Sequence, residues 1–392
     1  MNFVTIYYTS ALDGGICITG MDGSGAEIRI PAEIEGKPVT EIGAYAFAVT
    51  EEAPLLDEAE ETKLIFEKTE EGQKKAPLSK RSGNALQRLY LPDSIKKIGA
   101  YAMAGCNALQ VLHLPDTLEK ISNHMLSGCT GLLSLGLPAS LRMIEEYAFH
   151  DCRNLQKLVI PDAVEKLGRY AFYNCRKIES INIPKVTTDL GTGLFLNCDS
   201  LTYLSFGRCR HIGDLIAGLQ QELHITIEFE NNQIAKLLIP DFQYEYVEDT
   251  PARQFHQVNY GTGHLFRQCI GNTDIDFRRF DELFYLTRRE DGAAMVLILA
   301  MYRLEFPYRL EEKRRNDYLC FLREHLLWAA SYYISQGNLS AIRLFADWGL
   351  IEEKNIDDLL KLAGEKKKTE IAGFLLEYQH SHLKKKKKTF DL

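Results

Sequence analysis

The sequence predicts an α/β repeat solenoid of 23-residue units, followed by an all-helical C-terminal domain. The first observation is a row of cysteines that recur every 23 residues: Cys106, Cys129, Cys152, Cys175 and Cys198. The second is a row of prolines with the same spacing: Pro92, Pro115, Pro138, Pro161 and Pro184. The third is a change to helix-like spacing of apolar residues from about residue 273 onward. Because two residue types keep one period, the repeat defines the first part of the fold.

The overall composition is that of a globular protein. Of the 392 residues, 45% are apolar and 26% are charged, which excludes whole-chain disorder. The net charge of -8 does not suit a nucleic-acid binder. The longest apolar run, from Ala293 to Tyr302, has ten residues, whereas a membrane span needs about 20. We therefore expect no membrane span and no specific nucleic-acid partner.

The N-terminal residues predict a strand. Val4, Ile6 and Tyr8 alternate with other residues, and no cationic segment precedes a long apolar one, as a signal peptide would require. We therefore expect a cytoplasmic location, or a cell-surface or secreted one if a leader was removed. Nine cysteines in 392 residues are too few for a disulfide scaffold.

Each repeat unit divides into a strand and a second apolar segment. In the unit that begins at Cys106, Leu112 and Leu114 share one face of a short strand, and Val111 and His113 share the other. A proline ends the strand because it has no N–H to donate. The second half has apolar residues at helix-like spacing: Leu118, Ile121, Met125 and Leu126. We expect stacked units to share one core, with a parallel sheet on one side and helical segments on the other.

The pattern of the units resembles a known family. It is clearest in the copy Leu155-x-x-Leu158-x-Ile160-Pro161, which continues as Leu167-Gly168-x-Tyr170-Ala171-Phe172-x-x-Cys175. This pattern resembles the bacterial BspA-like group of leucine-rich repeat proteins, and the resemblance covers about residues 15–207. It implies a leucine-rich repeat solenoid and a role in protein interaction. The resemblance implies no catalytic site.

Changes in the pattern predict five segments. They are an N-terminal cap with the first repeat (1–48), an acidic insertion (49–83), leucine-rich repeats (84–207), a capping or transition segment with strands (208–270), and a helical, ankyrin-like domain with a poly-lysine tail (271–392). The insertion is interpreted either as a mobile acidic loop or as a partner-binding arm hinged on Leu64-Ile65-Phe66.

The C-terminal segment has two readings. Residues 337–349 and 359–378 resemble ankyrin helices, with Gly349 ending one helix and Asn355 and Thr369 as N-caps. The Thr-Pro-Leu-His opening of ankyrin repeats is absent and the spacing is about 30 residues, so a plain helical bundle competes with this reading. The run Lys384–Lys388 is either a solvated tail or a weak, salt-sensitive contact for anionic lipid or nucleic acid.

No residue is singled out as catalytic, cofactor-binding or metal-ligating. The repeat cysteines lack the close Cys-x-x-Cys pairs of zinc sites and are expected as small buried hydrophobes, although thiols on adjacent coils could come within disulfide reach. Tyr101, Tyr147 and Tyr170 recur at one position and are expected to stack at the edge of the core. The alternative function is an enzyme or nucleotide-binding module in residues 208–392, with a pocket lined by His256, His264 and nearby acids.

The favoured function is a non-enzymatic scaffold that binds a protein or peptide on the sheet face. Outward strand positions need not fill the core, so their side chains are free to serve recognition. Aromatic and basic side chains commonly dominate such interfaces. The residues expected to contribute are Arg88, Tyr90, His113, Lys157 and Tyr203.

Overall fold

The computed structural model describes residues 2–23, 25–49, 62–68, 85–207, 211–216, 218–249 and 254–383. The chain divides into two compact units, Met1–Asp276 and Phe277–Leu392, and each is described by itself. The lysine run Lys384–Lys388 and most of the acidic insertion lie outside the described residues, so the predictions for them stay predictions. In the described part of the chain, no helix joins the length and apolar character needed to cross a bilayer.

The first unit begins with a sheet whose strands run in the order β4-β5-β2-β1-β6. These strands are β1 (Asn2–Ser10), β2 (Ile16–Asp22), β4 (Glu33–Ile34), β5 (Lys37–Ile42) and β6 (Thr62–Lys68). The strand expected from Val4, Ile6 and Tyr8 is confirmed, and all three side chains are buried. β6 lies within the predicted insertion and pairs in parallel with β1, so residues 64–66, considered above as a hinge, belong to a strand.

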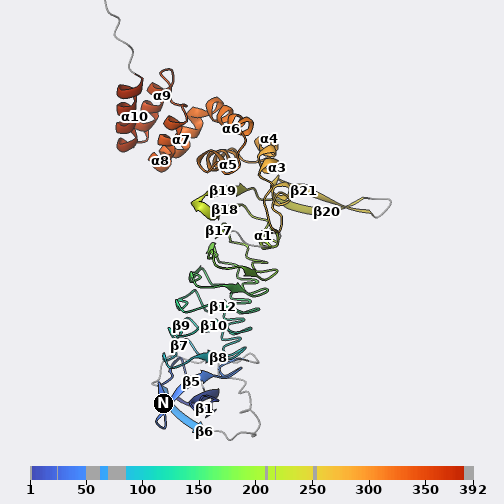
Figure 1. The fold of residues 1–392 in the computed structure, drawn as a ribbon, viewed down its shortest axis with the longest axis vertical. Coiled ribbons are helices and arrows are strands. Elements are labelled where there is room, and N and C mark those ends of the chain that lie inside the picture. The colour runs from blue at the N-terminus through green and yellow to red at the C-terminus, as the bar shows by residue number, and fades with distance from the viewer. Residues whose placement is uncertain are drawn as a thin grey trace, which may run out of the picture. The chain divides into compact units, whose positions relative to one another are not determined.

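The chain then winds into stacked coils, and each coil contributes two short strands (Figure 1). We call one set the first sheet: β3 (Glu27–Arg29), β7 (Arg88–Tyr90), β9 (Val111–His113), β11 (Ser134–Leu135), β13 (Lys157–Leu158), β15 (Ser180–Asn182) and β17 (Tyr203–Gly207). We call the other the second sheet: β8 (Lys97–Ile98), β10 (Lys120–Ile121), β12 (Met143–Ile144), β14 (Lys166–Leu167) and β16 (Asp189–Leu190). Residues 23 apart are partners, as Ser134 and Lys157 are, so the predicted solenoid is confirmed.

The helical segments expected in each unit are not formed, and that expectation was wrong. Between residues 85 and 207 the second half of each coil consists of a two-residue strand followed by turns. The N–H groups of Tyr101 and Met103 donate to carbonyl oxygens of the next coil, at 3.0 Å each, and so are not used within a helix. Tyr101 also has a left-handed backbone, with φ of 59°, which interrupts a right-handed helix. The apolar spacing of this segment therefore serves a coil with inward side chains at its corners.

A column of cysteines and a run of stacked phenylalanines lie in the core of the solenoid. Each repeat cysteine is buried, and its thiol donates to a carbonyl oxygen of the preceding coil, as Cys152 does to Leu126 at 3.1 Å. Burial raises the pKa of the Cys106 and Cys198 thiols to about 12. The phenyl rings of Phe149 and Phe172 stack at 5.3 Å between centroids. The expectation of a buried cysteine column is confirmed, and these thiols are free.

The coils end in a small capping region of the first unit. Strand β17 pairs in parallel with β18 (Leu223–Glu228), which pairs antiparallel with β19 (Ile234–Ile239). A hairpin of β20 (Gln243–Asp249) and β21 (Gln254–Tyr260) follows, and the short helices are α1 (Ile212–Ile216), η1 (Glu230–Asn232) and α2 (Gly263–Arg267). The buried guanidinium of Arg267 donates to the carbonyl oxygens of Leu219, Gln221 and Pro240 at 2.7–2.8 Å. These bonds tie together the loops that flank β18 and β19.

The second unit is helical, as predicted. Its helices are α3 (Phe277–Glu282), α4 (Phe284–Glu290), α5 (Ala293–Glu305), α6 (Glu312–Glu324), α7 (Leu326–Gln336), α8 (Leu339–Asp347), α9 (Ile356–Glu365) and α10 (Thr369–His382). Helix α7 packs on α9, and α8 packs on α10. The region thus stacks helix pairs, and its ankyrin-like character stays a prediction.

The helix ends agree only partly with the sequence. Gly349 has a left-handed backbone, with φ of 66°, directly after α8, as expected of a glycine that ends a helix. Asn355 is the N-cap residue of α9, as predicted, although its side chain accepts a bond from the N–H of Glu352 and none from the helix. Thr369 is the first residue of α10 rather than its N-cap, because Lys367, with φ of 55°, ends the preceding turn earlier.

A buried ion pair joins the first helices of the helical unit. The carboxylate of Asp281 in α3 accepts two hydrogen bonds from the guanidinium of Arg303 in α5, at 2.7 and 3.0 Å. The hydroxyl of Tyr318 in α6 donates a third at 2.8 Å. Arg303 is 0% exposed, and its remaining donors reach carbonyl oxygens of Phe306 and Tyr308. This network joins three helices through groups that are costly to bury unpaired.

Candidate interaction surface

The five residues predicted to bind a partner all lie on the outward face of the first sheet. Arg88 and Tyr90 come from β7, His113 from β9, Lys157 from β13 and Tyr203 from β17. With neighbouring strands about 4.8 Å apart, β7 and β17 are separated by roughly 24 Å. We call the outward side of the first sheet the sheet face. The five residues form a band along it and not one compact cluster.

At the N-terminal end of the sheet face, three of these residues form a cluster with two others. The guanidinium of Arg29 lies over the ring of Tyr90, 3.7 Å from its centroid, and Arg88 pairs with Glu27 at 3.5 Å. His113 meets the Tyr90 ring edge-on at 6.4 Å. Sequence reasoning missed Arg29 because the insertion hides the period that aligns it with Tyr90.

The other two predicted residues have separate surroundings. Tyr203 is 54% exposed, and its ring stacks on His224 of β18 at 4.7 Å between centroids. Lys157 is exposed on β13, and no carboxylate of the described residues lies within ion-pair distance of its ammonium group. The sheet face thus offers an aromatic pair at one end and an unpaired cation near its middle.

The second sheet differs sharply in how its charges are arranged. Lysines on its outward side pair with carboxylates of adjacent coils, as in Lys97–Glu41 at 3.3 Å, Lys120–Glu145 at 3.1 Å and Lys166–Asp189 at 2.9 Å. These ion pairs neutralise that face locally. The sheet face carries fewer such pairs, so its charges are more available to a partner.

A trough lies in the middle of the sheet face. Its volume is about 560 Å³, and its lining includes Ser134, Gly136, Ala139, Lys157, Val159 and Pro161. The hollow is created by Ser134 on β11 and by Gly136 directly after this strand. The equivalent positions hold the larger Val111 and His113 on one adjacent coil, and Lys157 and Val159 on the other. The sequence carries this signal as Ser134 and Gly136, but two small residues indicate a hollow only when the side chains on the adjacent coils are known.

A ladder of aromatic rings runs along one edge of the solenoid. The rings of Tyr45, Tyr101, His124, Tyr147 and Tyr170 stack in this order, with centroids 4.4–5.1 Å apart. The expected stacking of the recurring tyrosines is therefore confirmed, and it extends to Tyr45 and His124. All five residues have positive φ of 54–62°, which makes the corner sharp enough to align the rings. Because the rings cover one another's faces, the ladder stabilises the coils and leaves only ring edges for a ligand.

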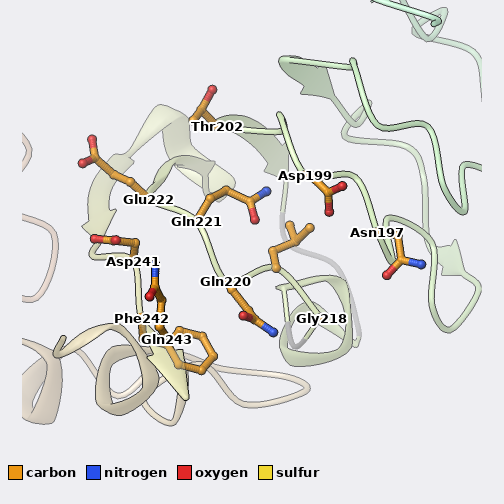
Figure 2. A pocket seen from close by; sticks show the side chains of 11 residues that line it. Asn197, Asp199, Thr202, Gly218, Gln220, Gln221, Glu222, Asp241, Phe242 and Gln243 are labelled. Atoms are coloured by element: carbon orange, nitrogen blue, oxygen red, sulfur yellow. The ribbon is translucent and has the colours of Figure 1, made fainter. Parts of the chain in front are cut away.

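A second hollow, of about 660 Å³, lies beside the end of the repeats (Figure 2). Its lining includes Asn197, Asp199, Gln220, Glu222, Asp241 and Phe242, and Figure 2 shows the Gln220 amide between Phe242 and the Asn197–Asp199 side. Glu222 and Asp199 have partners in His224 at 2.8 Å and Arg176 at 4.0 Å. The lining of this hollow is therefore mainly polar and acidic.

The histidine-lined pocket considered above lies partly outside the described side chains and stays a prediction. Nδ1 of His264 lies 3.2 Å from the Gly261 carbonyl oxygen, and His264 does not line the polar hollow. The side chain of His256 lies outside the described residues. Over the described ranges, no three His, Cys, Asp or Glu side chains converge as a metal site.

The coils and the sheet face define a leucine-rich repeat solenoid, and the comparison with family models names its type. Residues 81–209 match the model of the BspA type leucine rich repeat region in six copies. Leucine-rich repeat proteins of this kind generally take part in protein–protein interaction. A comparison with curated proteins gives no match.

Solved structures of bacterial leucine-rich repeat proteins are similar to this chain. The T. pallidum leucine rich repeat protein is 29% identical, with a TM-score of 0.40, over 51% of this chain and 82% of the other. A leucine rich cell surface protein from Faecalibacterium prausnitzii is 19% identical, with a TM-score of 0.37, over 58% of each chain. A leucine-rich repeat protein from Bacteroides ovatus is 21% identical, with a TM-score of 0.31, over 57% of this chain and 76% of the other.

Proposed function

We propose that this protein is a non-enzymatic scaffold that binds a protein or peptide partner on the sheet face of its solenoid. The observation that carries the proposal is the contrast between the two faces. The second sheet pairs its own charges between coils, whereas the sheet face presents aromatic rings, an unpaired lysine and a trough. Exposed aromatic and cationic groups around a hollow are typical of interaction surfaces.

Panning of a displayed library of random 16-residue peptides on the full chain tests this proposal. The variant replaces Arg88, Tyr90, His113, Lys157 and Tyr203 by alanine. These side chains lie outside the core, so the thermal unfolding curve should stay close to that of the wild type. We expect the enriched peptides to bind the variant at least tenfold more weakly.

A matched control replaces Lys97, Lys120 and Lys166 of the second sheet by alanine, and the enriched peptides should keep their affinity for it. Recovery of no binder, or of binders that the sheet-face variant retains, contradicts the proposal. Binders that compete for the polar hollow near Gln220 would favour the alternative of a ligand-binding module in residues 208–392.

We also propose a cytoplasmic location. Eight cysteines of the described residues are free, which suits a reducing compartment. The Faecalibacterium prausnitzii protein is described as a cell surface protein, so a surface location is the competing outcome. Immunoblotting of cytosolic and surface fractions from the native cell distinguishes the two.

A further inference from the structure

The trough in the sheet face exists because side chains are missing from one coil. Gly136 has no side chain, and a Cβ built on it would meet no atom within 4 Å. The equivalent position on the next coil holds Val159, which is 79% exposed. A small coil between larger neighbours leaves a hollow that opens to solvent, and its floor is the backbone of the coil that contains β11.

The walls of the trough suit an aliphatic side chain. Val159, Pro161, Ala139 and Ala163 line it with apolar groups. Val111, in the coil on the other side of β11, is 40% exposed and adds apolar surface near this hollow. Burial of apolar surface is favourable, so an aliphatic group placed here would be favoured over water.

The ammonium group of Lys157 beside the trough favours a ligand in which a carboxylate lies next to the aliphatic side chain. Lys157 lines the trough and has no ion-pair partner among the described residues, whereas Lys120 and Lys166 of the second sheet are both paired. Asp162 stands at the rim without reaching the Lys157 ammonium group. An unpaired ammonium next to an apolar wall is complementary to a carboxylate that accompanies an apolar group.

The hollow continues along the solenoid, which suits an extended chain. A smaller hollow of about 350 Å³ shares Asp162 with the trough and includes Asn182, Pro184 and Val186 in its lining. From β11 to β17 there are three strand-to-strand steps, or about 14 Å. An extended peptide covers this distance with about four residues.

We propose that the trough binds an extended peptide segment of a partner protein in which an aliphatic side chain lies next to an aspartate or glutamate. This inference rests on the proposed function, since it names the partner chemistry of the same face. The aliphatic side chain fills the space above Gly136, and the carboxylate pairs with Lys157. The rest of the segment follows the groove toward Pro184.

Fluorescence polarisation with four labelled nine-residue peptides tests the inference on the full chain. The peptides carry a central Leu-Glu, Leu-Gln, Leu-Lys or Ala-Glu pair in a background of serine, glycine and threonine. We expect Leu-Glu to bind best, and Leu-Gln and Ala-Glu to bind about tenfold more weakly, because each lacks one of the two contacts. For Lys157→Glu, the preferred peptide should change from Leu-Glu to Leu-Lys.

The variant Gly136→Phe is designed to fill the trough, because a Cβ at this position meets no atom within 4 Å and the backbone φ is not positive. It should lose at least tenfold in affinity for the Leu-Glu peptide. The matched control is Gly292→Phe, which adds the same ring at an exposed glycine of the helical unit that also has no atom within 4 Å of a built Cβ, and it should stay within about twofold of the wild type. Unchanged thermal unfolding of both variants shows that the fold is kept.

Three results overturn the inference: no binding of the Leu-Glu peptide to the wild type, equal binding of Leu-Lys, or equal effects of Gly136→Phe and Gly292→Phe. These failures are distinguishable from failure of the proposed function. If the panned library peptides depend on Arg88 and Tyr203 but not on Gly136, the sheet face still docks partners and only the trough is wrong. If those peptides ignore every sheet-face substitution, both proposals fall.

Discussion

In the solenoid, similar contacts recur along successive coils, whereas in the helical unit three helices meet at one buried polar network. The cysteine thiols, the stacked phenylalanines and the aromatic ladder each repeat at 23-residue intervals. The helical unit instead joins α3, α5 and α6 through Asp281, Arg303 and Tyr318. A single substitution should therefore affect the helical unit more than the solenoid, where neighbouring coils keep their own contacts.

The largest effect is expected for Asp281→Ala. Removal of the carboxylate leaves the guanidinium of Arg303 buried without its partner, which costs about 3–5 kcal/mol in the free energy of unfolding. Both tryptophans, Trp328 and Trp348, lie in the helical unit, so tryptophan fluorescence during urea unfolding reports on that unit. The fluorescence midpoint should fall to a much lower urea concentration.

The control for this substitution is Arg288→Ala, which removes an exposed pair with Glu324 and should cost at most about 1 kcal/mol. Equal shifts of the fluorescence midpoint in the two variants would contradict the central role assigned to the buried network.

An intermediate effect is expected for Cys152→Ala in the solenoid. The variant loses one thiol hydrogen bond and a small buried group, and the carbonyl of Leu126 keeps its bond from the N–H of Cys129. The free energy of unfolding should fall by about 1 kcal/mol, measured by far-UV circular dichroism. A loss as large as that of Asp281→Ala would show that the coils are not independent in the way the repeated contacts indicate.

The smallest effect is expected for His124→Tyr, which restores the residue type found at its equivalents Tyr101 and Tyr147. Burial, and after it the charge of His150, lower the pKa of His124, while Glu146 opposes this shift. The unfolded chain then binds the proton more readily than the folded one, so the stability of the wild type falls as pH drops below about 6.5. The variant should lose less stability than the wild type between pH 7 and pH 5 in urea titrations. Parallel curves for the two proteins would show that protonation of His124 does not oppose folding.

The inward residues of the solenoid could be predicted from the sequence because their period is simple. The buried column of Cys106 to Cys198 and the outward positions of Arg88 and Tyr203 follow from a spacing of 23 residues. The form of the second half of each unit could not be predicted in this way. Apolar residues such as Leu118 and Ile121 at helix-like spacing are buried equally well by a helix or by a coil with sharp corners.

The candidate surface could likewise be predicted from the sequence only in part. Lys157 and Tyr203 were predicted on the sheet face, because alternation alone assigns side chains to one side of a strand. The trough at Gly136 was not predicted, because a glycine marks a hollow only once the side chains on the adjacent coils are known to stand around it. The pairing of Arg29 with Tyr90 was likewise hidden by the insertion between them.

The amino-acid sequence alone established that the chain is a 23-residue solenoid joined to a helical region, and which side chains face inward, since period and polarity are properties of the order of residues. The stacking of the coils decided which hydrogen bonds and ion pairs form between them. It directed the N–H groups of Tyr101 and Met103 to the next coil instead of into a helix, and paired Lys166 with Asp189 while leaving Lys157 without a carboxylate. Such contacts join residues about one period apart, and only the assembled coils bring their atoms within bonding distance.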